Sequence, residues 1–530
     1  MKRHSRKILI LILAVILFSI CIGILNFRTG DIEYVNSDAT WHTLLTIRAY
    51  KETPVSVHKF LPIVSLGKLT DKHISWGGAV PDQYGNHYYT SFSPTGYFLP
   101  YLFMEVFSLE VNETSLYIFN TFLLVISSCL LAIFLLSLFD ESSHKWLISF
   151  FGTVIYVLEP EILHGMGLVY WHHSVMQVTL LLQIYCYWKY RKENSKGFKF
   201  AFYILCFINP YIEWTGYVAN IGFALSELVM GRKKMLSAFA DAVKVGILTV
   251  MSFTVFTLHF LLNISPERFL TELKLRSKVR SFAANISTSL LFRGYLTSFC
   301  YTWILLFSLL ILATVIYKGL VWRKQSVLIK NFWIIFVASF PILENFIMKE
   351  HAILYPYDRM KLIFPVCLIC CDLIYLIFKK SSKAVLRVVI FLTVSLAGLL
   401  NVYAYRSSPS YVWDAPYMNQ NRVLADYLNT SYPDAVYCTN TTVRGYINLT
   451  FGRGVHETAS LDSIIPIAQR SNVDKVVYFE HDPAVDVLYV NFPTASYGVE
   501  WQAIVYTISD DSYRIIHADS NGRILDKQFS

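Results

Sequence analysis

ILILILAVILFSICIGIL, from Ile8 to Leu25, and LYIFNTFLLVISSCLLAIFLLSL, from Leu116 to Leu138, decide the fold class of this 530-residue chain. Each stretch is long enough to cross a hydrocarbon core of roughly 30 Å as a helix. The composition agrees, because 55% of the residues are hydrophobic, only 16% are charged, and the mean hydropathy is +0.44. A soluble domain has about a quarter of its residues charged. We therefore expect a mainly α-helical, polytopic membrane protein.

The first apolar stretch has the basic start of a secretory signal peptide, over residues 2–7. Its apolar part, at about 19 residues, is longer than that of a signal peptide. No small-residue cleavage site follows Asn26 and Phe27. We therefore expect a first helix that is retained.

Apolar runs predict a bundle of eleven spanning helices. The fifth and sixth runs are short and meet at Asn209-Pro210, where proline is expected to end a helix. The runs lie near residues 8–27, 115–138, 145–160, 168–188, 199–210, 212–230, 237–262, 295–318, 328–347, 357–378 and 384–404.

The distribution of Lys and Arg predicts the orientation of these helices, because such residues collect in cytoplasmic loops. The outer loops at 159–167 and 210–211 carry no Lys or Arg, and most of the basic clusters flank the loops on the other side. This pattern predicts an N-terminus inside and a C-terminus outside, and we expect the plasma (inner) membrane as the location. It also explains the net charge of +9 without nucleic acid, which we exclude as a partner. The predicted inner loops are 1–7, 139–144, 189–198, 231–236, 319–327 and 379–383.

Three outer segments remain, at 28–114, 263–294 and 405–530. We predict a transmembrane domain over 1–404, which includes the first outer loop, and a small extracytoplasmic α/β domain over 405–530. A helix-like pattern at Asn421–Leu428 and strand-like runs at 435–438, 475–479 and 485–490 indicate the α/β domain. The middle segment is unusually basic for an outer loop and fits either a solvated helix or a segment that attracts lipid phosphate.

The start of the first outer loop carries Asp38 and His42, four residues apart in a predicted interfacial helix. They would share one helical face. Asp38 could remove a proton from an acceptor hydroxyl, with His42 orienting it or helping to bind a metal. Spacing alone favours a second interpretation, in which Asp38 caps the helix.

Several acidic and histidine residues lie near membrane depth, where they are expected to face a cavity or the outer interface. They do not form a defined metal signature, and the nine cysteines show neither a disulfide framework nor a zinc pattern. We predict no cofactor, with a divalent metal as the alternative, and expect these side chains to line the acceptor or sugar pocket. They are Glu159, Glu161, His164, His172, His173, Glu213 and Glu344.

Two further segments complete a recognisable order of parts. The first outer loop ends in YGNHYYTSFSPTGY (84–97), with His87 and Tyr88, and a late outer turn reads ENFIMKEHAILYPYDRMKLIFP (344–365). An early acidic residue, two interfacial helices, the Tyr-Tyr…Ser-Pro turn and this late turn resemble the GT-C superfamily. Those polytopic glycosyltransferases use polyprenyl-phosphate-linked sugars and include protein mannosyltransferases and aminoarabinose transferases.

The resemblance implies Asp38 as catalytic base, with Asp31 and Glu33 as reserves. Arg359 and Lys361 stand at the outer mouth of a helix, where they would bind phosphate or simply snorkel. The resemblance also implies hexosyl or pentosyl transfer from a polyprenyl-phosphate donor to a lipid, glycan or protein acceptor at the outer face. The substrate-binding residues would be His42, His87, Tyr88, His351, Tyr355, Arg359 and Lys361.

Two other functions remain open from the sequence. A flippase or transporter of a lipid-linked saccharide would suit interrupted helices and intramembrane carboxylates. A non-catalytic subunit of an envelope polysaccharide system would suit the same architecture.

Overall fold

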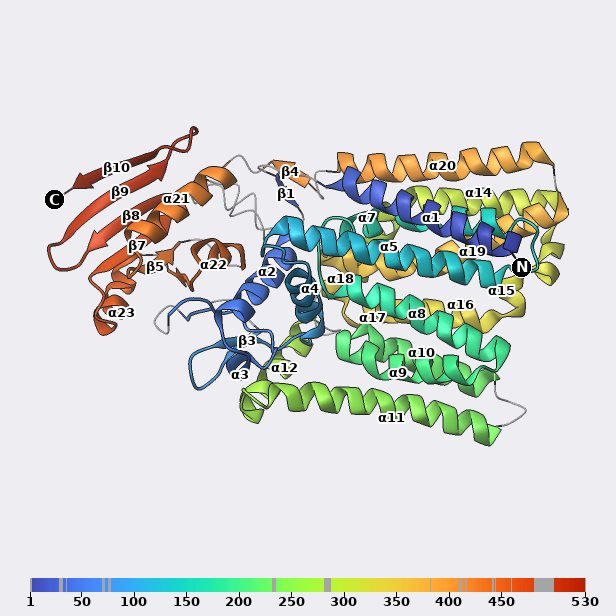
Figure 1. The fold of residues 1–530 in the computed structure, drawn as a ribbon, viewed down its shortest axis with the longest axis horizontal. Helices are drawn as coiled ribbons and strands as arrows, with labels where there is room; N and C mark the ends of the chain where they lie inside the picture. Colours follow the sequence, from blue (N-terminus) through green and yellow to red (C-terminus); the bar gives the residue numbers. More distant parts are fainter. Residues whose placement is uncertain are drawn as a thin grey trace. The chain divides into compact units, whose positions relative to one another are not determined.

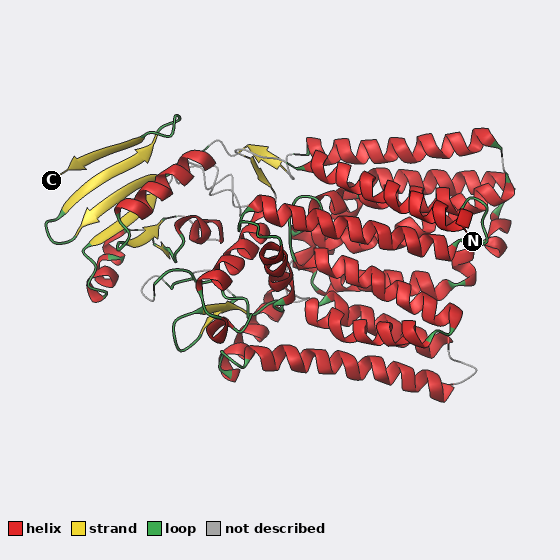
Figure 2. Ribbon diagram, viewed as in Figure 1, coloured by secondary structure: helices red, strands yellow, loops and turns green. Residues whose placement is uncertain are grey.

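The computed structural model describes most of the chain and is mainly helical (Figure 2). It divides into two compact units. The first, here the helical unit, comprises Met1–Phe27, Tyr117–Leu258 and Ser277–Ser407, and the second, here the outer unit, comprises Arg28–Leu116, His259–Arg276 and Ser408–Ser530. The description leaves out residues 1, 28–31, 35, 69–71, 75–77, 231–234, 281–286, 382, 409–411, 415–416, 441–442, 444, 459, 481–499 and 530.

The helical unit is built around α19, which packs against α6 and α14, while α20 packs against α14 and α6 (Figure 1). A second group forms where α9 packs against both α8 and α10. The elements of this unit are α1 (Lys2–Asn26), α5 (Glu113–Leu138), α6 (Lys145–Val157), α7 (Pro160–Gly165), α8 (His172–Glu193), α9 (Lys196–Ile212), α10 (Thr215–Met230), α11 (Met235–Phe260), α13 (Thr288–Ser298), α14 (Cys300–Ile316), η3 (Leu320–Gln325), α15 (Val327–Lys330), α16 (Phe332–Ser339), η4 (Phe340–Ile342), α17 (Leu343–Ile347), α18 (Lys349–Leu354), η5 (Pro356–Leu362), α19 (Ile363–Lys380) and α20 (Ala384–Ser407).

Five helical segments of the described chain are long and apolar enough to cross a membrane. They are α1, α5, α11, α20 and the continuous segment Pro356–Lys380, and α13 with α14 makes a sixth if that pair, bent by 71°, is one span. The other predicted spans fall on shorter or more polar helices, such as the 13-residue α6 and the 17-residue α9. The chain is thus an integral membrane protein, and the count of eleven spans stays a prediction.

The predicted helix break at Asn209-Pro210 is wrong, because α9 continues through Pro210 to Ile212. A proline inside a helix leaves the carbonyl four residues earlier without its donor. Here that carbonyl, of Cys206, accepts a hydrogen bond of 2.6 Å from Asn220 Nδ2 on α10. Gln183 Nε2 donates to Asn220 Oδ1 over 2.9 Å, and Asn209 Nδ2 donates to Gln183 Oε1 over 2.6 Å. Side chains from neighbouring helices therefore replace the missing backbone bond, as membrane helices require.

The outer unit contains the first outer loop and a C-terminal sheet with strand order β10-β9-β8-β7-β5-β6. The pairs β5–β6 and β5–β7 are parallel, and β7–β8, β8–β9 and β9–β10 are antiparallel. The bounds are β1 (Ile32–Tyr34), α2 (Ser37–Glu52), α3 (Val55–His58), β2 (Ala79–Pro81), β3 (His87–Tyr89), α4 (Thr95–Val106), α12 (Pro266–Arg280), β4 (Val412–Asp414), α21 (Met418–Ser431), β5 (Val436–Thr439), α22 (Gly445–Phe451), β6 (His456–Glu457), η6 (Leu461–Ser463), α23 (Ile465–Arg470), β7 (Lys475–Glu480), β8 (Gln502–Thr507), β9 (Ser512–Ala518) and β10 (Ile524–Phe529).

The two compact units are grouped differently from the predicted domains. The change of unit between Ser407 and Ser408 lies close to the predicted boundary at 404, but the first outer loop and His259–Arg276 group with the C-terminal region. One reason is the packing of α2 against α22, where a Cβ on Gly445 would come within 3.0 Å of the backbone nitrogen of His42. The predicted strand at 485–490 lies outside the described residues.

Candidate functional site

The helical unit buries an unusual number of charged side chains around η5. Asp358, Arg359 and Lys361 on this 3₁₀ turn are 0%, 5% and 4% exposed. Buried charge within a membrane bundle is costly and marks a functional position. We therefore take the surroundings of η5 as the candidate site.

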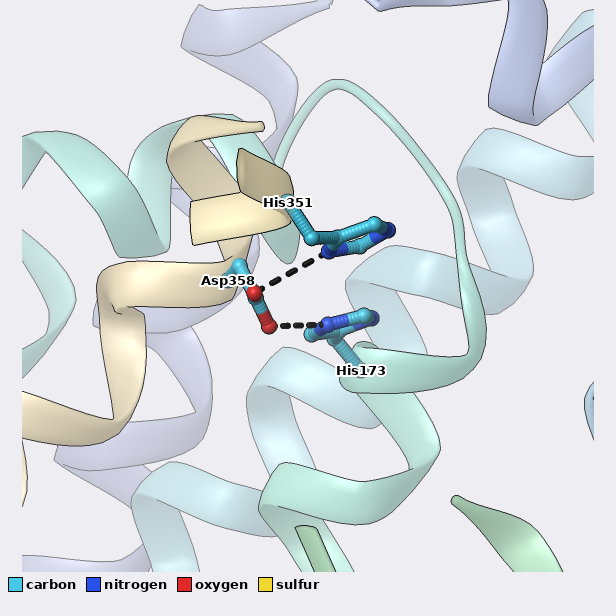
Figure 3. A group of neighbouring side chains, drawn as sticks. All are labelled: His173, His351 and Asp358. Atoms are coloured by element: carbon cyan, nitrogen blue, oxygen red, sulfur yellow. Dashed lines mark hydrogen bonds and ion pairs between the residues drawn. The ribbon is translucent and has the colours of Figure 1, made fainter. Parts of the chain in front are cut away.

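Asp358 lies between two histidines that come from distant parts of the chain (Figure 3). Its Oδ1 lies 2.5 Å from His173 Nε2, at the start of α8, and its Oδ2 lies 3.0 Å from His351 Nδ1, on α18. The two imidazoles are nearly parallel, with centroids 5.8 Å apart. Glu213, just after α9, brings its Oε1 within 3.0 Å of His173 Nε2. Imidazole and carboxylate groups at this spacing can act as metal ligands, and those of His173, His351 and Asp358 all lie within 4.8 Å of one another.

Lys361 sits on the other side of Asp358 and joins a second group of acids. Its ammonium forms an ion pair with Glu344 and lies 3.1 Å from Asp358 Oδ1. Thr215 Oγ1 donates to Glu344 Oε2 over 2.8 Å and accepts from Lys361 over 3.2 Å. The lysine therefore neutralises part of a strongly acidic neighbourhood.

Arg359 points to a different partner, Glu161 on α7. Its Nη2 lies 2.8 Å and its Nε 3.0 Å from Glu161 Oε1, and its Nη1 donates to the Ala352 carbonyl over 2.7 Å. Glu159 Oε2 accepts from the Glu161 backbone N–H over 2.8 Å and so caps α7. Both cations that were predicted to bind phosphate are thus paired with buried carboxylates.

The outer unit holds the remaining predicted residues, with Asp38 and His42 on one face of α2. The prediction that Asp38 caps this helix is wrong, because the N-cap is Asn36 and Asp38 lies inside the first turn. Asn36 has a φ of 61°, which starts the helix from a left-handed residue. Asp38 is half-buried, and its assignment as the catalytic base stays a prediction.

His42 is packed among aromatic rings rather than exposed to solvent. It is 8% exposed, meets Tyr89 edge to face at 4.6 Å, and its Nε2 lies 3.5 Å from the Tyr97 hydroxyl. The Arg276 guanidinium lies over the Tyr89 ring at 5.6 Å. Burial, and next the charge of Arg276, lower the pKa of His42 to about 3. His42 is therefore neutral at physiological pH.

This environment predicts an acid-sensitive stability. The unfolded chain binds a proton at His42 below pH 6.5, whereas the folded chain does so only near pH 3, so stability falls as pH drops through this window. We expect His42→Phe, which keeps an aromatic ring, to remove up to about 2 kcal/mol of the acid destabilisation at pH 5. Apparent unfolding temperatures at pH 5 and 7.5 in detergent measure this, with His144→Phe as control. Equal acid sensitivity in the wild type and His42→Phe would contradict it.

Tyr88 and His87, the other two predicted substrate-binding residues of the first outer loop, lie in β3. Tyr88 is fully buried, and its hydroxyl lies 3.2 Å from Asp82 Oδ2 and accepts from Asn263 Nδ2 over 2.9 Å. His87 lies in β3, where its backbone N–H donates to Ser65 Oγ over 3.0 Å. Within the outer unit it is Tyr89, one residue later, that contacts His42.

The structure brings the late predicted residues together and adds others to them. His351, Tyr355, Arg359 and Lys361 all belong to α18, η5 and the link between them, and the centroid of the Tyr355 ring lies 4.4 Å from that of His351, with the rings tilted by 35°. Asp358, within the quoted late turn, was given no role from sequence. Only its spacing to Lys361, three residues along one turn, offered a signal.

Comparisons with known proteins concern the fold. No protein-family model and no curated relative matches the sequence. The apo oligosaccharyltransferase of Archaeoglobus fulgidus matches 89% of this chain and 69% of its own at 12% identity, with a TM-score of 0.50. The oligosaccharyltransferase AglB from A. fulgidus, in complex with an inhibitory peptide and a dolichol-phosphate, matches 98% of this chain and 74% of its own at 12% identity, with a TM-score of 0.52. ArnT from Cupriavidus metallidurans has a TM-score of 0.43 at 10% identity over 97% of both chains.

Proposed function

We propose, from the GT-C-like fold that the chain has, that it is a membrane glycosyltransferase. It would move a sugar from a polyprenyl-phosphate donor to a hydroxyl or amine acceptor. The observation that carries the proposal is the buried charged network around η5, set in a helical unit of this fold. The dolichol-phosphate bound by AglB belongs to the donor class proposed here.

The reaction is a displacement at the anomeric carbon of the donor. The acceptor oxygen or nitrogen forms a bond to that carbon, and the bond from carbon to phosphate oxygen breaks with its electron pair leaving on the phosphate. Asp38 takes the acceptor proton as the new bond forms, a contribution that general bases make by factors of about 10²–10⁴. Attack from the face opposite the phosphate inverts the configuration.

Arg359 and Lys361 are proposed to hold the leaving phosphate. A phosphate bound in place of the Glu161 carboxylate would receive two parallel hydrogen bonds from the guanidinium. Charge that develops on the phosphate oxygen is stabilised by such preorganised donors, so no strong general acid is needed. Exchange of one carboxylate partner for the donor phosphate is thus part of donor binding.

The site would face away from the cytoplasm, as the distribution of Lys and Arg predicts, in the plasma membrane. The sheet of the outer unit, β5 to β10, would help to select the acceptor. Its parallel core, β6-β5-β7, continues into an antiparallel edge that ends at β10.

Release of labelled sugar tests the reaction directly. Purified chain in detergent, given a radiolabelled polyprenyl-phosphate sugar and a lipid, glycan or protein acceptor fraction, is expected to transfer label to the acceptor with time. Liposomes that contain the chain and the same donor are the parallel assay. Movement of the intact donor across the bilayer without release of sugar would replace the transferase by a flippase.

A further inference from the structure

We propose that His173, His351, Asp358 and Glu213 bind one divalent transition-metal ion. The proposal does not depend on glycosyl transfer, since it rests on the ligand geometry alone. The four groups come from α8, α18, η5 and the residue after α9 (Figure 3 shows three of them). Each of these side chains is at most 10% exposed.

Three contacts link the four groups at close to the spacing of metal ligands. His173 Nε2 lies 2.5 Å from Asp358 Oδ1 and 3.0 Å from Glu213 Oε1, and His351 Nδ1 lies 3.0 Å from Asp358 Oδ2. Ligand atoms of a tetrahedral ion with bonds of about 2.1 Å stand about 3.4 Å apart. For these three pairs, an outward shift of a few tenths of an ångström would exchange the contact for bonds to a shared ion.

Charge also favours a cation here. Glu213, Glu344 and Asp358 place three buried carboxylates against one ammonium, that of Lys361, with the two histidines between them. Glu213 Oε2 is buried and has no hydrogen-bond partner within the described parts of the chain. Unbalanced buried carboxylates are expensive, and a divalent ion would neutralise the excess.

A neighbouring triad of acids, Glu213, Glu344 and Asp358, also has metal-like spacing. The Lys361 ammonium already binds Glu344 and Asp358, so an internal cation takes the place of an ion there. The imidazole nitrogens of His173 and His351 instead contact carboxylates, those of Asp358 and Glu213. This difference places the ion at the histidines.

The ligand set selects the metal. Two imidazoles with two carboxylates suit Zn²⁺ or Mn²⁺, whereas Mg²⁺ and Ca²⁺ prefer sites made of oxygen alone. The ion would hold the start of α8, α18 and η5 together.

Metal content of the full chain tests the proposal. The chain is purified in detergent through a tag without histidine, stripped with a chelator, and reloaded with Zn²⁺ or Mn²⁺ before elemental analysis. We expect about one ion per chain in the wild type and less than about a tenth in His173→Ala and in His351→Ala. Excess Mg²⁺ should not displace it. His144→Ala, at a histidine before α6 and outside the cluster, should keep the ion.

A second measurement, made on the wild type, tests the proposal even if the histidine variants do not fold. X-ray absorption of the zinc-loaded wild type should show about two imidazole ligands at roughly 2.0–2.1 Å. The proposal is overturned if the wild type takes up no stoichiometric ion, if the bound zinc lacks imidazole ligands, or if both folded histidine variants bind as the wild type does. A wild-type chain that binds the ion but transfers no sugar would instead count against the proposed reaction alone.

Discussion

Replacing Asp38 with asparagine is expected to reduce sugar transfer by about 10²–10⁴-fold, the range that a lost general base produces. Asparagine keeps the shape of the side chain and its place in the first turn of α2 but cannot accept the acceptor proton. Because Asp38 is half-buried and is not the helix cap, the variant should fold normally. Initial rates with labelled donor at saturating acceptor measure the effect.

Asp82→Asn is the matched control for this variant. Asp82 is also in the outer unit, where its carboxylate accepts from the Tyr84 and Asn86 backbone N–H groups at 2.7 and 2.9 Å and binds the Tyr88 hydroxyl. This substitution should lower the apparent unfolding temperature and leave the rate per folded molecule near that of the wild type. A fully active Asp38→Asn would remove Asp38 from the mechanism and pass the role to Glu33 or Asp31.

Replacing Arg359 with glutamine is expected to be the most damaging change in the helical unit. It leaves Glu161, which is fully buried, without its cation, and breaking a buried ion pair in this way costs about 3–5 kcal/mol. The lost stability alone would abolish transfer, so the single variant does not separate folding from function. Thermal unfolding in detergent measures the first effect.

The double variant Arg359→Gln with Glu161→Gln separates the two roles. Two neutral amides can hydrogen-bond to each other, so most of the stability should return. Transfer should remain below the wild type by at least about 10²-fold, because the leaving phosphate still lacks the guanidinium. A stable and fully active double variant would show that Arg359 serves only the fold.

Local pattern predicted the longest apolar helices, such as α1, α5 and α20, because hydrophobic runs of 18 residues or more have few alternatives in a membrane. The continuation of α9 through Pro210 could not be predicted in this way. Its missing hydrogen bond is replaced by Asn220, on the next helix, and by the arrangement of Gln183 and Asn209 around it. Whether a proline ends a helix thus depends on whether a neighbouring side chain can donate to the carbonyl four residues before it.

The candidate site was partly predictable for a similar reason. The late turn was singled out by its resemblance to the GT-C superfamily and by Arg359 and Lys361 at the predicted outer mouth of a helix. His173 lies 185 residues before Asp358, and Arg359 lies 198 residues after Glu161, so neither pairing has a signature in spacing. Asp38 was read as a cap because Asp is common there, but the left-handed Asn36 begins the helix two residues earlier.

The bond from Asn220 to the Cys206 carbonyl has an evolutionary corollary. It is needed only while residue 210 is proline, since any other residue there would return a backbone N–H to that carbonyl. Among homologous chains, retention of the proline should therefore hold a side-chain donor at 220. Loss of the proline should remove that demand and leave at position 220 only the demand of the bond from Gln183.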